Sequence, residues 1–410
     1  MPDRDAPQPR GFDVLVVGAG ISGSALAVAL SGQGLRIGLV EARPLSADPV
    51  PPEPGLAGFD VRVSALTPHS VDLLDRLGAW PAIQNHRACP YIHMTVWDAE
   101  GTGRIDFDSR ELGLPALGTL VENSAVTAAL SACVRLAPDI EVLAPRRLEH
   151  ARRTADGIVV TLDDGTHCAA SLTVGADGAL SPLRDLLGFA TREWSYRQRA
   201  IVATVETERH HADTAWQRFL PTGPLALLPL PDSGGRHYCS IVWSLDDVEV
   251  DPVLALEDSD FCAALGDAAE HCLGPVLASS PRAAFPLRQR HAIHYVEPGV
   301  ALVADAAHTI HPLAGQGINL GLADVDELAR VVLEARTRGL PPGTLSVLQR
   351  YQRRRKGSNL AMMAAMDGFR HLFGSRRLPV RWLRNVGLRQ ADALPALKKR
   401  LMRHAMGLAE

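Results

Sequence analysis

A chain of 410 residues is longer than one hydrophobic core usually supports, so two domains or one large composite unit are expected. A composition of 46% hydrophobic and 21% charged residues, with a net charge of −4, excludes a protein that binds nucleic acid through its charge. The cysteines form no CxxC pair and show no metal-ligand spacing with histidine, so we expect free thiols, no metal site and a reducing compartment. No apolar run reaches about 18 residues and the N-terminus has no apolar core, which predicts neither a membrane span nor a signal peptide and favours a cytoplasmic location.

A dinucleotide-binding unit is predicted at the start of the chain. Two short apolar runs, 12–17 (FDVLVV) and 35–40 (LRIGLV), are typical of buried parallel strands. Between them lie the glycine turn GAGISG and a stretch with helical apolar spacing, and the second run ends on Glu41. A strand, glycine turn, helix, strand and acid within about 30 residues together form the complete dinucleotide-binding fingerprint.

Each polar or glycine position of this unit has a physical role. Gly18 allows a tight turn, Gly20 lets the backbone approach a pyrophosphate, and Gly23 lets the helix and strand pack closely. The helix N-terminus offers N–H donors and its positive dipole to the phosphates. Glu41 is placed to accept hydrogen bonds from both ribose hydroxyls.

Two further stretches precede the middle of the chain. Residues 60–80 predict a short strand and an amphipathic helix, with Arg62 before the helix, where a solvated side chain is the ordinary expectation for an isolated arginine. Residues 172–184 (LTVGADGALSPLR) predict a buried strand that ends in a turn carrying Asp177, with Arg184 behind it.

The middle of the chain, residues 194–285, differs in character. The β-rich runs IVATVET, LALLPLP and YCSIVWSL follow one another without helices between them, which predicts a largely antiparallel sheet inserted into the nucleotide-binding fold. Its large apolar residues are expected mostly in the core, the alternative being the wall of an apolar pocket: Trp216, Phe219, Leu228 and Trp243.

Residues 304–321 read ADAAHTIHPLAGQGINLG and follow another short strand at 299–305. A stretch with helical spacing comes next, so the order of strand, polar loop and helix recurs here. This loop is therefore predicted at the carboxyl edge of the parallel sheet, where ligands bind in such folds.

The tail after residue 351 is predicted to be helical and basic. From residue 370 onward the only acids are Asp392 and Glu410, whereas lysine and arginine are frequent. Two interpretations fit equally well: amphipathic helices lying on anionic lipid, and helices packed on the protein itself with a solvated basic face.

The three motifs GAGISG with Glu41, GADGALSPLR and DAAHTIHPLAGQGINLG together resemble the single-component FAD-dependent aromatic hydroxylases. Within that group the sequence is most similar to the hydroxylases of ubiquinone biosynthesis, and the resemblance covers essentially the whole chain. It is carried by DVRVSAL (60–66), WDAEG (97–101), LVENSAV (120–126), FPLRQRHA (285–292) and WLRNVGL (382–388). The stretch REWSYRQRAIVATVET resembles the 2-polyprenylphenol 6-hydroxylase branch, whereas TAWQRFLPTGPLALLPL resembles the sister that acts on the methoxy-methyl-benzoquinol intermediate.

The resemblance implies an α/β fold of composite α+β form. It has a Rossmann-like FAD-binding domain, an inserted and largely antiparallel substrate domain, and a C-terminal helical tail. The expected ranges are 1–75, 100–185 and 286–350 for the FAD-binding domain, 76–99 and 186–285 for the substrate domain, and 351–410 for the tail.

The resemblance also assigns roles to residues of the first two motifs. It places the FAD diphosphate at the three glycines Gly18, Gly20 and Gly23, and the adenosine ribose at Glu41. It implies that Arg62 contacts FAD and the passing nicotinamide cofactor, in place of the solvated arginine expected from its position alone.

Further roles follow from the same resemblance. Asn123 is implied to contact the flavin, and the motif of Asp177 is implied to serve both FAD and NAD(P)H. Asp305 is implied to bind the ribityl chain or its phosphate. Backbone N–H groups are implied to face the flavin pyrimidine ring at Gly317, Ile318 and Asn319.

The implied reaction uses bound FAD, with NAD(P)H and O₂ as co-substrates, and hydroxylates a polyprenylated phenol through a flavin C4a-hydroperoxide. The chain has only one dinucleotide fingerprint, so NAD(P)H is expected to bind transiently.

Two histidines are candidates for withdrawing the phenol proton, His308 and His311. The alternative is that a histidine braces the loop. Pro312 is expected beside the substrate. The implied setting is the inner face of the membrane, among other proteins of ubiquinone biosynthesis.

Other readings stay open at this point. The chain could be a hydroxylase for another ring position, a different flavoenzyme, a silent subunit of a lipid-synthesis complex, or a non-enzymatic prenyl-lipid carrier with the same fold.

Ala304 departs from the family, which usually has glycine immediately before the aspartate at position 305. If the position requires a positive φ, alanine costs about 1 kcal/mol there.

Overall fold

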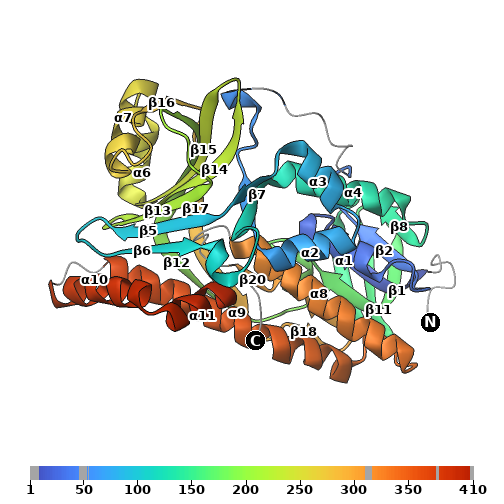
Figure 1. Cartoon of the computed structure of the whole chain (residues 1–410). Helices are drawn as coiled ribbons and strands as arrows, with labels where there is room; N and C mark the ends of the chain where they lie inside the picture. Colours follow the sequence, from blue (N-terminus) through green and yellow to red (C-terminus); the bar gives the residue numbers. More distant parts are fainter. Residues whose placement is uncertain (1–8, 46–52, 54, 310–315, 375–377, 407–410) are drawn as a thin grey trace.

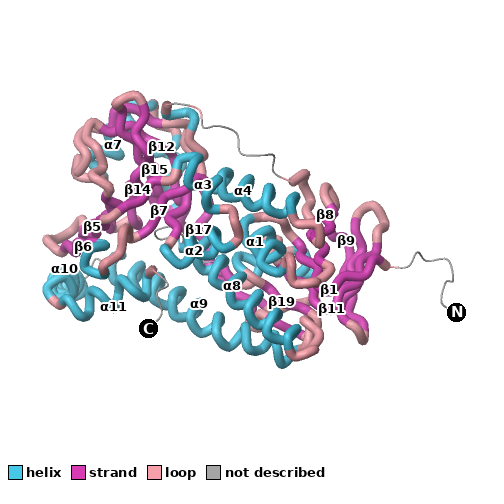
Figure 2. The backbone as a smooth tube through the Cα atoms, turned by 45° about the vertical axis from the view of Figure 1, so that its right-hand side comes forward, coloured by secondary structure: helices cyan, strands magenta, loops and turns pink. Residues whose placement is uncertain are grey.

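A computed structural model describes residues 9–45, 53, 55–309, 316–374 and 378–406 (Figure 1). Over these residues the chain forms an eight-stranded sheet, a nine-stranded sheet and a small three-stranded sheet. Helices surround the first large sheet, and three further helices run along one side of the molecule toward the C-terminus (Figures 1 and 2). The α/β composite fold expected from the sequence is confirmed.

The eight-stranded sheet contains the predicted dinucleotide-binding unit. Its order is β18 (Val296–Glu297), β19 (Val300–Leu302), β11 (His167–Gly175), β1 (Arg10–Val17), β2 (Ile37–Val40) and β8 (Ile140–Leu143), with β10 (Gly157–Leu162) and β9 (Leu148–Thr154) added to β11. The strands from β19 to β8 are mutually parallel. Val14, Leu15 and Val16 are all fully buried, as apolar runs in a parallel sheet must be when both of its faces are covered.

Helices cover this sheet and complete its core. They are α1 (Ile21–Leu30), α4 (Asn123–Leu136), α5 (Pro182–Leu186) and α8 (Gln316–Thr337). Helix α1 packs against both α4 and α8, so the helix that follows the glycine turn lies beside the helix that follows the loop at 304–309.

The nine-stranded sheet contains the β-rich runs predicted for the middle of the chain. Its order is β20 (His308–Thr309), β17 (Ala283–Ala292), β12 (Thr191–Thr207), β15 (Arg236–Asp246), β14 (Gly223–Ser233), β13 (Thr214–Leu220), β5 (His93–Asp98) and β6 (Arg104–Asp108), with β16 (Val276–Ser279) on β12. All its neighbouring strands are antiparallel except β13 and β5. Helices α6 (Asp247–Leu254) and α7 (Asp258–Ala268) pack on one of its faces. Strand β6 falls within the range 100–185 expected for the FAD-binding domain, but its local hairpin with β5 places it in this sheet.

The three-stranded sheet joins the two larger ones. It consists of β3 (Val63–Leu66), β7 (Gly118–Glu122) and β4 (Cys89–Tyr91), and it is accompanied by α2 (Pro68–Arg76) and α3 (Trp80–Arg87). Ala65 and Leu120 of this sheet share an apolar cluster with Ala215, Ala226 and Leu228 of the nine-stranded sheet.

The C-terminal region forms α9 (Leu345–Gly374), α10 (Leu378–Ala393) and α11 (Pro395–Ala405), which lie along the lower edge of the molecule (Figure 1). Several of its basic residues are engaged inside the protein. Arg384 is buried and pairs with Asp98, and Lys398 pairs with Glu111. None of the helices formed by the described residues has both the length and the apolar character needed to cross a bilayer.

Candidate functional site

Three motif loops begin side by side at one edge of the parallel sheet. Val17 at the end of β1 pairs in register with Gly175 of β11 and with Val40 of β2, and Gly175 pairs with Leu302 of β19. The segments that follow these strands carry the glycine turn, Glu41, the Asp177 turn and the loop of Asp305. The topology therefore brings together motifs that lie as far apart as residues 18 and 305.

The glycine turn has the geometry that a phosphate cradle requires. Gly18 adopts a φ of +100°, and a Cβ there would lie 2.5 Å from the carbonyl oxygen of Ala176. A Cβ on Gly23 would lie 1.8 Å from the carbonyl oxygen of Gly18, so helix and turn meet without room for a side chain. A Cβ on Gly20, in contrast, would have no atom within 4 Å, which leaves open space in front of the helix N-terminus. Since Gly20 provides no side-chain cap either, this turn fits a dinucleotide diphosphate.

Glu41 closes the same turn from the end of β2. Its Oε2 accepts a hydrogen bond of 2.7 Å from the backbone N–H of Ala19, and its Oε1 accepts one from the backbone N–H of Arg43. The carboxylate therefore stands next to the cradle, as a ribose-binding acid must.

Ala304, at the start of the third loop, adopts a φ of +52°. This is the left-handed region that favours glycine, so the position does require a positive φ. The methyl group of Ala304 lies over Gly321 of α8, where an added Cβ would be 2.8 Å from it and 3.0 Å from Oγ of Ser22. The first turn of α1, the first turns of α8 and the loop of Asp305 thus meet at one point, and Gly321 leaves the space that the alanine methyl group occupies.

Asp305 is an exposed residue. Protein atoms near its carboxyl group desolvate it in part, which raises the pKa of Asp305 from the ordinary value. The His308 ring and the Arg62 guanidinium act in the opposite direction, which places Arg62 within electrostatic reach of Asp305. Asn123 lies next to Arg62: its backbone N–H donates to the Arg62 carbonyl oxygen at 3.0 Å, and its Oδ1 accepts from Ser64. Arg62 and Asn123, which the resemblance assigns to the flavin, are therefore neighbours, and Arg62 is within electrostatic reach of Asp305.

The first turn of α8 has two different faces. A Cβ on Gly317 would have no atom of the described residues within 4 Å, so with respect to them the backbone there is open to close approach, and Ile318 beside it is half-buried. The side chain of Asn319 points the other way. It accepts from the backbone N–H of Thr67 and from Ser70, and donates to the Ala65 carbonyl oxygen at 2.8 Å. The amide of Asn319 therefore braces α8 against the turn between β3 and α2, and only its backbone N–H remains a candidate for ligand contact.

The turn after β11 carries a buried, incompletely paired carboxylate. Oδ2 of Asp177 accepts from the backbone N–H of Leu183, whereas its Oδ1 has no hydrogen-bond partner among the described residues. Burial raises the pKa of Asp177. Arg184 is itself buried and donates to the carbonyl oxygen of Ala306 at 3.2 Å, so it ties this turn to the loop of Asp305.

Of the two candidate proton acceptors, only His308 can be located. It is 2% exposed, and its Nε2 contacts Oδ2 of Asp324 in α8 at 2.5 Å. This geometry favours the bracing alternative for His308 over a role at the substrate. His311 and Pro312 lie outside the described residues, so their expected roles stay predictions.

Sequence reasoning missed Asp324 and the two α9 side chains that contact it, Arg355 and Asn359. A signal was present, because Asp324 stands on the apolar stripe of its helix, four residues before Leu328 and seven before Val331. An acid on a buried stripe must find partners in the interior.

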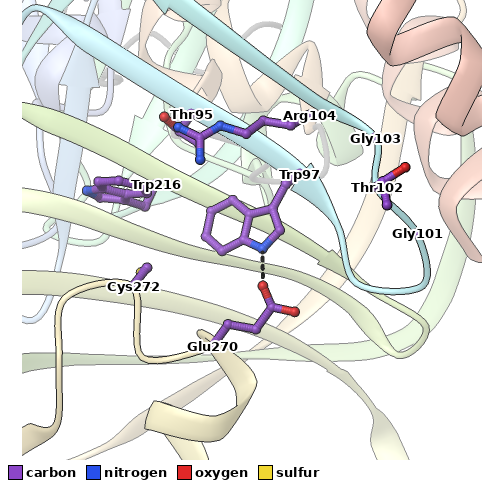
Figure 3. Close-up of a pocket in the computed structure, with 9 residues that line it drawn as sticks. All are labelled: Thr95, Trp97, Gly101, Thr102, Gly103, Arg104, Trp216, Glu270 and Cys272. Carbon is purple, nitrogen blue, oxygen red and sulfur yellow. Dashed lines mark hydrogen bonds between the residues drawn. The ribbon is translucent and has the colours of Figure 1, made fainter.

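A pocket of about 270 Å³ lies away from these loops (Figure 3). Trp97 donates from its Nε1 to Glu270 at 2.9 Å and stands edge-on to Trp216, with Cys272 beside them (Figure 3). Trp216 packs with the cluster under α6 and α7, whereas its neighbour Ala215 faces the three-stranded sheet. The pocket is therefore on the outer face of the nine-stranded sheet, and the other large residues considered as pocket walls are core: Phe219, Leu228 and Trp243.

A separate polar cluster has ligand atoms close enough to share a cation by distance alone, at His210, His211 and Asp232. Nδ1 of His211 accepts from the backbone N–H of Asp213, and its Nε2 contacts the Leu230 carbonyl oxygen at 2.9 Å. Nδ1 of His210 likewise accepts a backbone N–H two residues on. These bonds occupy the lone pairs that a metal would need, so the cluster is explained by backbone bracing.

Known proteins resemble this chain along nearly its whole length. A family model described as an FAD binding domain matches residues 11–365. The 3-demethoxyubiquinol 3-hydroxylase of Escherichia coli (strain K12) is 38% identical over 401 residues, which cover 97% of this chain and 98% of that protein. Ubiquinone hydroxylase UbiL of Rhodospirillum rubrum is 38% identical, with 96% of this chain and 89% of that protein covered. The mitochondrial ubiquinone biosynthesis monooxygenase COQ6 of Homo sapiens is 34% identical, with coverages of 96% and 92%.

Solved structures share the fold. PqsL of Pseudomonas aeruginosa, described as a probable FAD-dependent monooxygenase, superposes with a TM-score of 0.74 at 22% identity, covering 93% of this chain and 100% of that one. The p-nitrophenol 4-monooxygenase PnpA of Pseudomonas putida DLL-E4 gives a TM-score of 0.75 at 19% identity, with coverages of 98% and 100%. At these identities the likeness establishes the arrangement of the sheets and helices alone.

Proposed function

This chain belongs to the FAD-dependent hydroxylases of ubiquinone biosynthesis, and on that basis we propose that it hydroxylates the ring of a polyprenylated phenol intermediate, with NAD(P)H and O₂ as co-substrates. It is an FAD-dependent monooxygenase by family. As its substrate we propose a 2-polyprenylphenol, hydroxylated at ring position 6.

The observation that carries this proposal is the junction between the two large sheets. The loop of Asp305 leaves β19 of the eight-stranded sheet, and three residues after Asp305 the pair His308 and Thr309 forms β20, which pairs with β17 of the nine-stranded sheet. The same edge carries the glycine cradle. A dinucleotide held there would extend toward the region where the three-stranded sheet packs on the second sheet through the apolar residues Ala226 and Leu228.

The proposed cofactor contacts follow the geometry of this edge. Gly18, Gly20 and Gly23 would hold the diphosphate, Glu41 the adenosine ribose, and Asp305 the ribityl chain. Bound FAD supplies the redox and oxygen chemistry that no side chain provides.

The remaining cofactor contacts surround the isoalloxazine end. Arg62 and Asn123 would approach the flavin from the end of the three-stranded sheet. Asp177 would serve FAD and NAD(P)H, which fits its unpaired Oδ1. The ring edge would meet the open backbone of the first turn of α8, at Gly317, Ile318 and Asn319.

The proposed substrate contacts follow from the sequence. We assign to His311 the withdrawal of the phenol proton, because a more electron-rich ring is easier to hydroxylate, and to Pro312 the border of the substrate ring. His308 already contacts Asp324, which leaves His311 as the remaining candidate. We also propose the division stated above into FAD-binding, substrate-binding and tail regions, with β6 moved to the substrate-binding part.

A second candidate reaction is favoured by one observation. The relative named 3-demethoxyubiquinol 3-hydroxylase shares 38% identity with this chain over nearly the full length of both proteins. The substrate of this chain would then be a later intermediate, a quinol that already carries methoxy and methyl groups, in place of the less substituted polyprenylphenol.

Deleting the gene in its own host and identifying the accumulated precursor tests both candidates. Accumulation of a polyprenylphenol that lacks the second ring hydroxyl supports the main proposal, whereas accumulation of the demethoxy quinone supports the second. Unchanged quinone content with no precursor in a host that has no second such hydroxylase would contradict both.

A His311→Ala variant is expected to keep FAD and to uncouple NAD(P)H oxidation from hydroxylation, and unchanged coupling would contradict the role given to His311.

A further inference from the structure

Asp324 of α8 is a fully buried carboxylate that contacts both the loop of Asp305 and helix α9. Its Oδ2 accepts the backbone N–H of Ala304 at 3.1 Å and contacts Nε2 of His308 at 2.5 Å. Its Oδ1 accepts from Nε of Arg355 at 2.7 Å and from Nδ2 of Asn359 at 3.1 Å. Both carboxylate oxygens are therefore occupied, one by the loop of Asp305 and the other by α9.

The charges around Asp324 favour its ionised form. Burial alone would raise its pKa, but the His308 ring and the Arg355 guanidinium outweigh that effect and lower the pKa of Asp324 to about 2. A buried carboxylate with this many donors is held in one orientation, because each donor that moved away would leave charge unpaired in the interior.

The two contacts on Oδ2 bracket Asp305 in the sequence. Ala304 precedes it and is held at a positive φ of +52°, a conformation that alanine adopts only under constraint. His308 follows three residues later and begins the short strand on the nine-stranded sheet. Fixing these two points fixes the direction in which Asp305 leaves the backbone.

We propose that Asp324 is a positioning residue for the cofactor. Through the N–H of Ala304 and the ring of His308, it holds Asp305 in the orientation needed to bind the flavin side of FAD. The role rests on the proposed contact of Asp305 with FAD and does not depend on which phenol is the substrate. Arg355 and Asn359 extend the same support into α9, so the C-terminal region is coupled to the cofactor loop.

The test compares Asp324→Asn with a matched control, Tyr351→Phe. Tyr351 is also fully buried on α9 and donates from its hydroxyl to the Leu302 carbonyl oxygen at 2.8 Å, just before the same loop, without contacting Asp305. For each protein, the melting temperature of the apo form, the Kd for FAD and the visible absorption spectrum of the bound flavin are measured well below the melting transition.

Asp324→Asn is expected to raise the Kd for FAD at least about tenfold, equivalent to roughly 1.4 kcal/mol, and to change the fine structure of the bound flavin spectrum. Tyr351→Phe is expected to lower the apo melting temperature while its Kd and spectrum stay as in the wild type. A folded Asp324→Asn protein with wild-type Kd and spectrum would overturn the proposal, as would an equal loss of affinity in Tyr351→Phe.

A second pair keeps the test valid if Asp324→Asn does not fold. His308→Gln retains a donor toward Asp324, whereas His308→Leu removes it. The leucine variant is expected to lose affinity for FAD and the glutamine variant to recover most of it, and equal affinities in the two would contradict the proposal. Because these readouts concern FAD alone, a failure of the proposed substrate leaves them interpretable.

Discussion

At the scale of single residues, Ala304 and Gly321 form a compensated pair. Ala304 stands in a backbone conformation that glycine adopts more easily, and its methyl group occupies the space that the missing side chain of Gly321 leaves open. An alanine at each position would bring two Cβ atoms within 2.8 Å of each other. The tolerance for alanine at 304 is therefore a property of the pair.

A double-mutant cycle tests this pair. We expect Gly321→Ala to destabilise the protein by about 1–3 kcal/mol, the usual cost of overpacking, because the new methyl group meets that of Ala304. Ala304→Gly should change stability by less than about 1 kcal/mol, since relief of the backbone strain offsets the lost methyl contact. Gly321→Ala in the Ala304→Gly background should cost about 1 kcal/mol less than in the wild type, as measured by urea unfolding. Strict additivity of the two substitutions would contradict the pairing.

The glycine cradle allows folding and cofactor binding to be separated. Gly20→Ala adds a methyl group to open space at a φ of −68°, so the apo protein should keep its stability within about 0.5 kcal/mol. The Kd for FAD should nevertheless rise at least about tenfold, because the methyl group stands where the diphosphate would lie. Gly23→Ala should instead destabilise the apo protein itself, since its Cβ would be 1.8 Å from the carbonyl oxygen of Gly18. Equilibrium titration with FAD and apo unfolding curves check both, and wild-type affinity in Gly20→Ala would remove this turn from the site.

At the scale of elements, two stretches noted only for their family likeness meet in the structure. Asp98 of β5 accepts from Nε of Arg384 in α10 at 2.7 Å and from Nδ2 of Asn385 at 2.8 Å. Gly101 lies so close to the Asn385 amide that an added Cβ would be 2.3 Å from it. The hairpin of β5 and β6 and the tail helix α10 are thus one packed unit, joined by a fully buried ion pair.

Removing Arg384 is expected to loosen the tail. Arg384→Ala removes the cationic partner of the buried Asp98 carboxylate, and breaking a buried ion pair in this way typically costs about 3–5 kcal/mol. Arg104→Ala is the matched control on the same hairpin, because its ion pair with Asp106 is about half exposed and should contribute at most about 1 kcal/mol. Urea unfolding and limited proteolysis of the segment 378–406 measure the two effects. Equal costs for the two variants would show that the tail is held by other contacts.

The elements that sequence reasoning predicted correctly are those encoded by local patterns. The strands at 12–17 and 35–40 and the turns at Gly18 and Asp177 follow from short-range spacing, and the common sheet edge follows from the rule that ligands bind at the ends of parallel strands. The pairs of Asp324 with Arg355 and of Asp98 with Arg384 were not predicted, because no local period records a partner that is distant in the chain. The sequence predicted a role only for the backbone N–H of Asn319, because the inward direction of its side chain depends on packing against the β3–α2 turn.

At the scale of the whole molecule, the basic residues of the tail divide into paired and exposed ones, a division that the sequence pattern could not show. Arg381, Arg384 and Lys398 are paired with acids of the protein, so they are not available to a membrane surface. The exposed residues of the tail include Trp382 of α10, which is 69% exposed, and basic residues of α11. A membrane-facing surface, if the tail has one, must therefore be built from this remainder.

We predict that the exposed basic residues of α11 bind anionic lipid, since the proposed substrate is polyprenylated. Lys399 and Arg403 are both exposed and stand four residues apart, on one face of α11. Reversing both charges with Lys399→Glu and Arg403→Glu should weaken binding to vesicles of anionic phospholipid at least about tenfold, since each basic residue near such a surface contributes about 1 kcal/mol. The matched control is Arg152→Glu with Arg338→Glu, an equal change of charge at exposed positions of β9 and of the segment after α8. Co-sedimentation at low salt measures the binding. An equal loss in the control would show that only net charge matters, and a wild-type protein that stays in the supernatant would refute the lipid surface altogether.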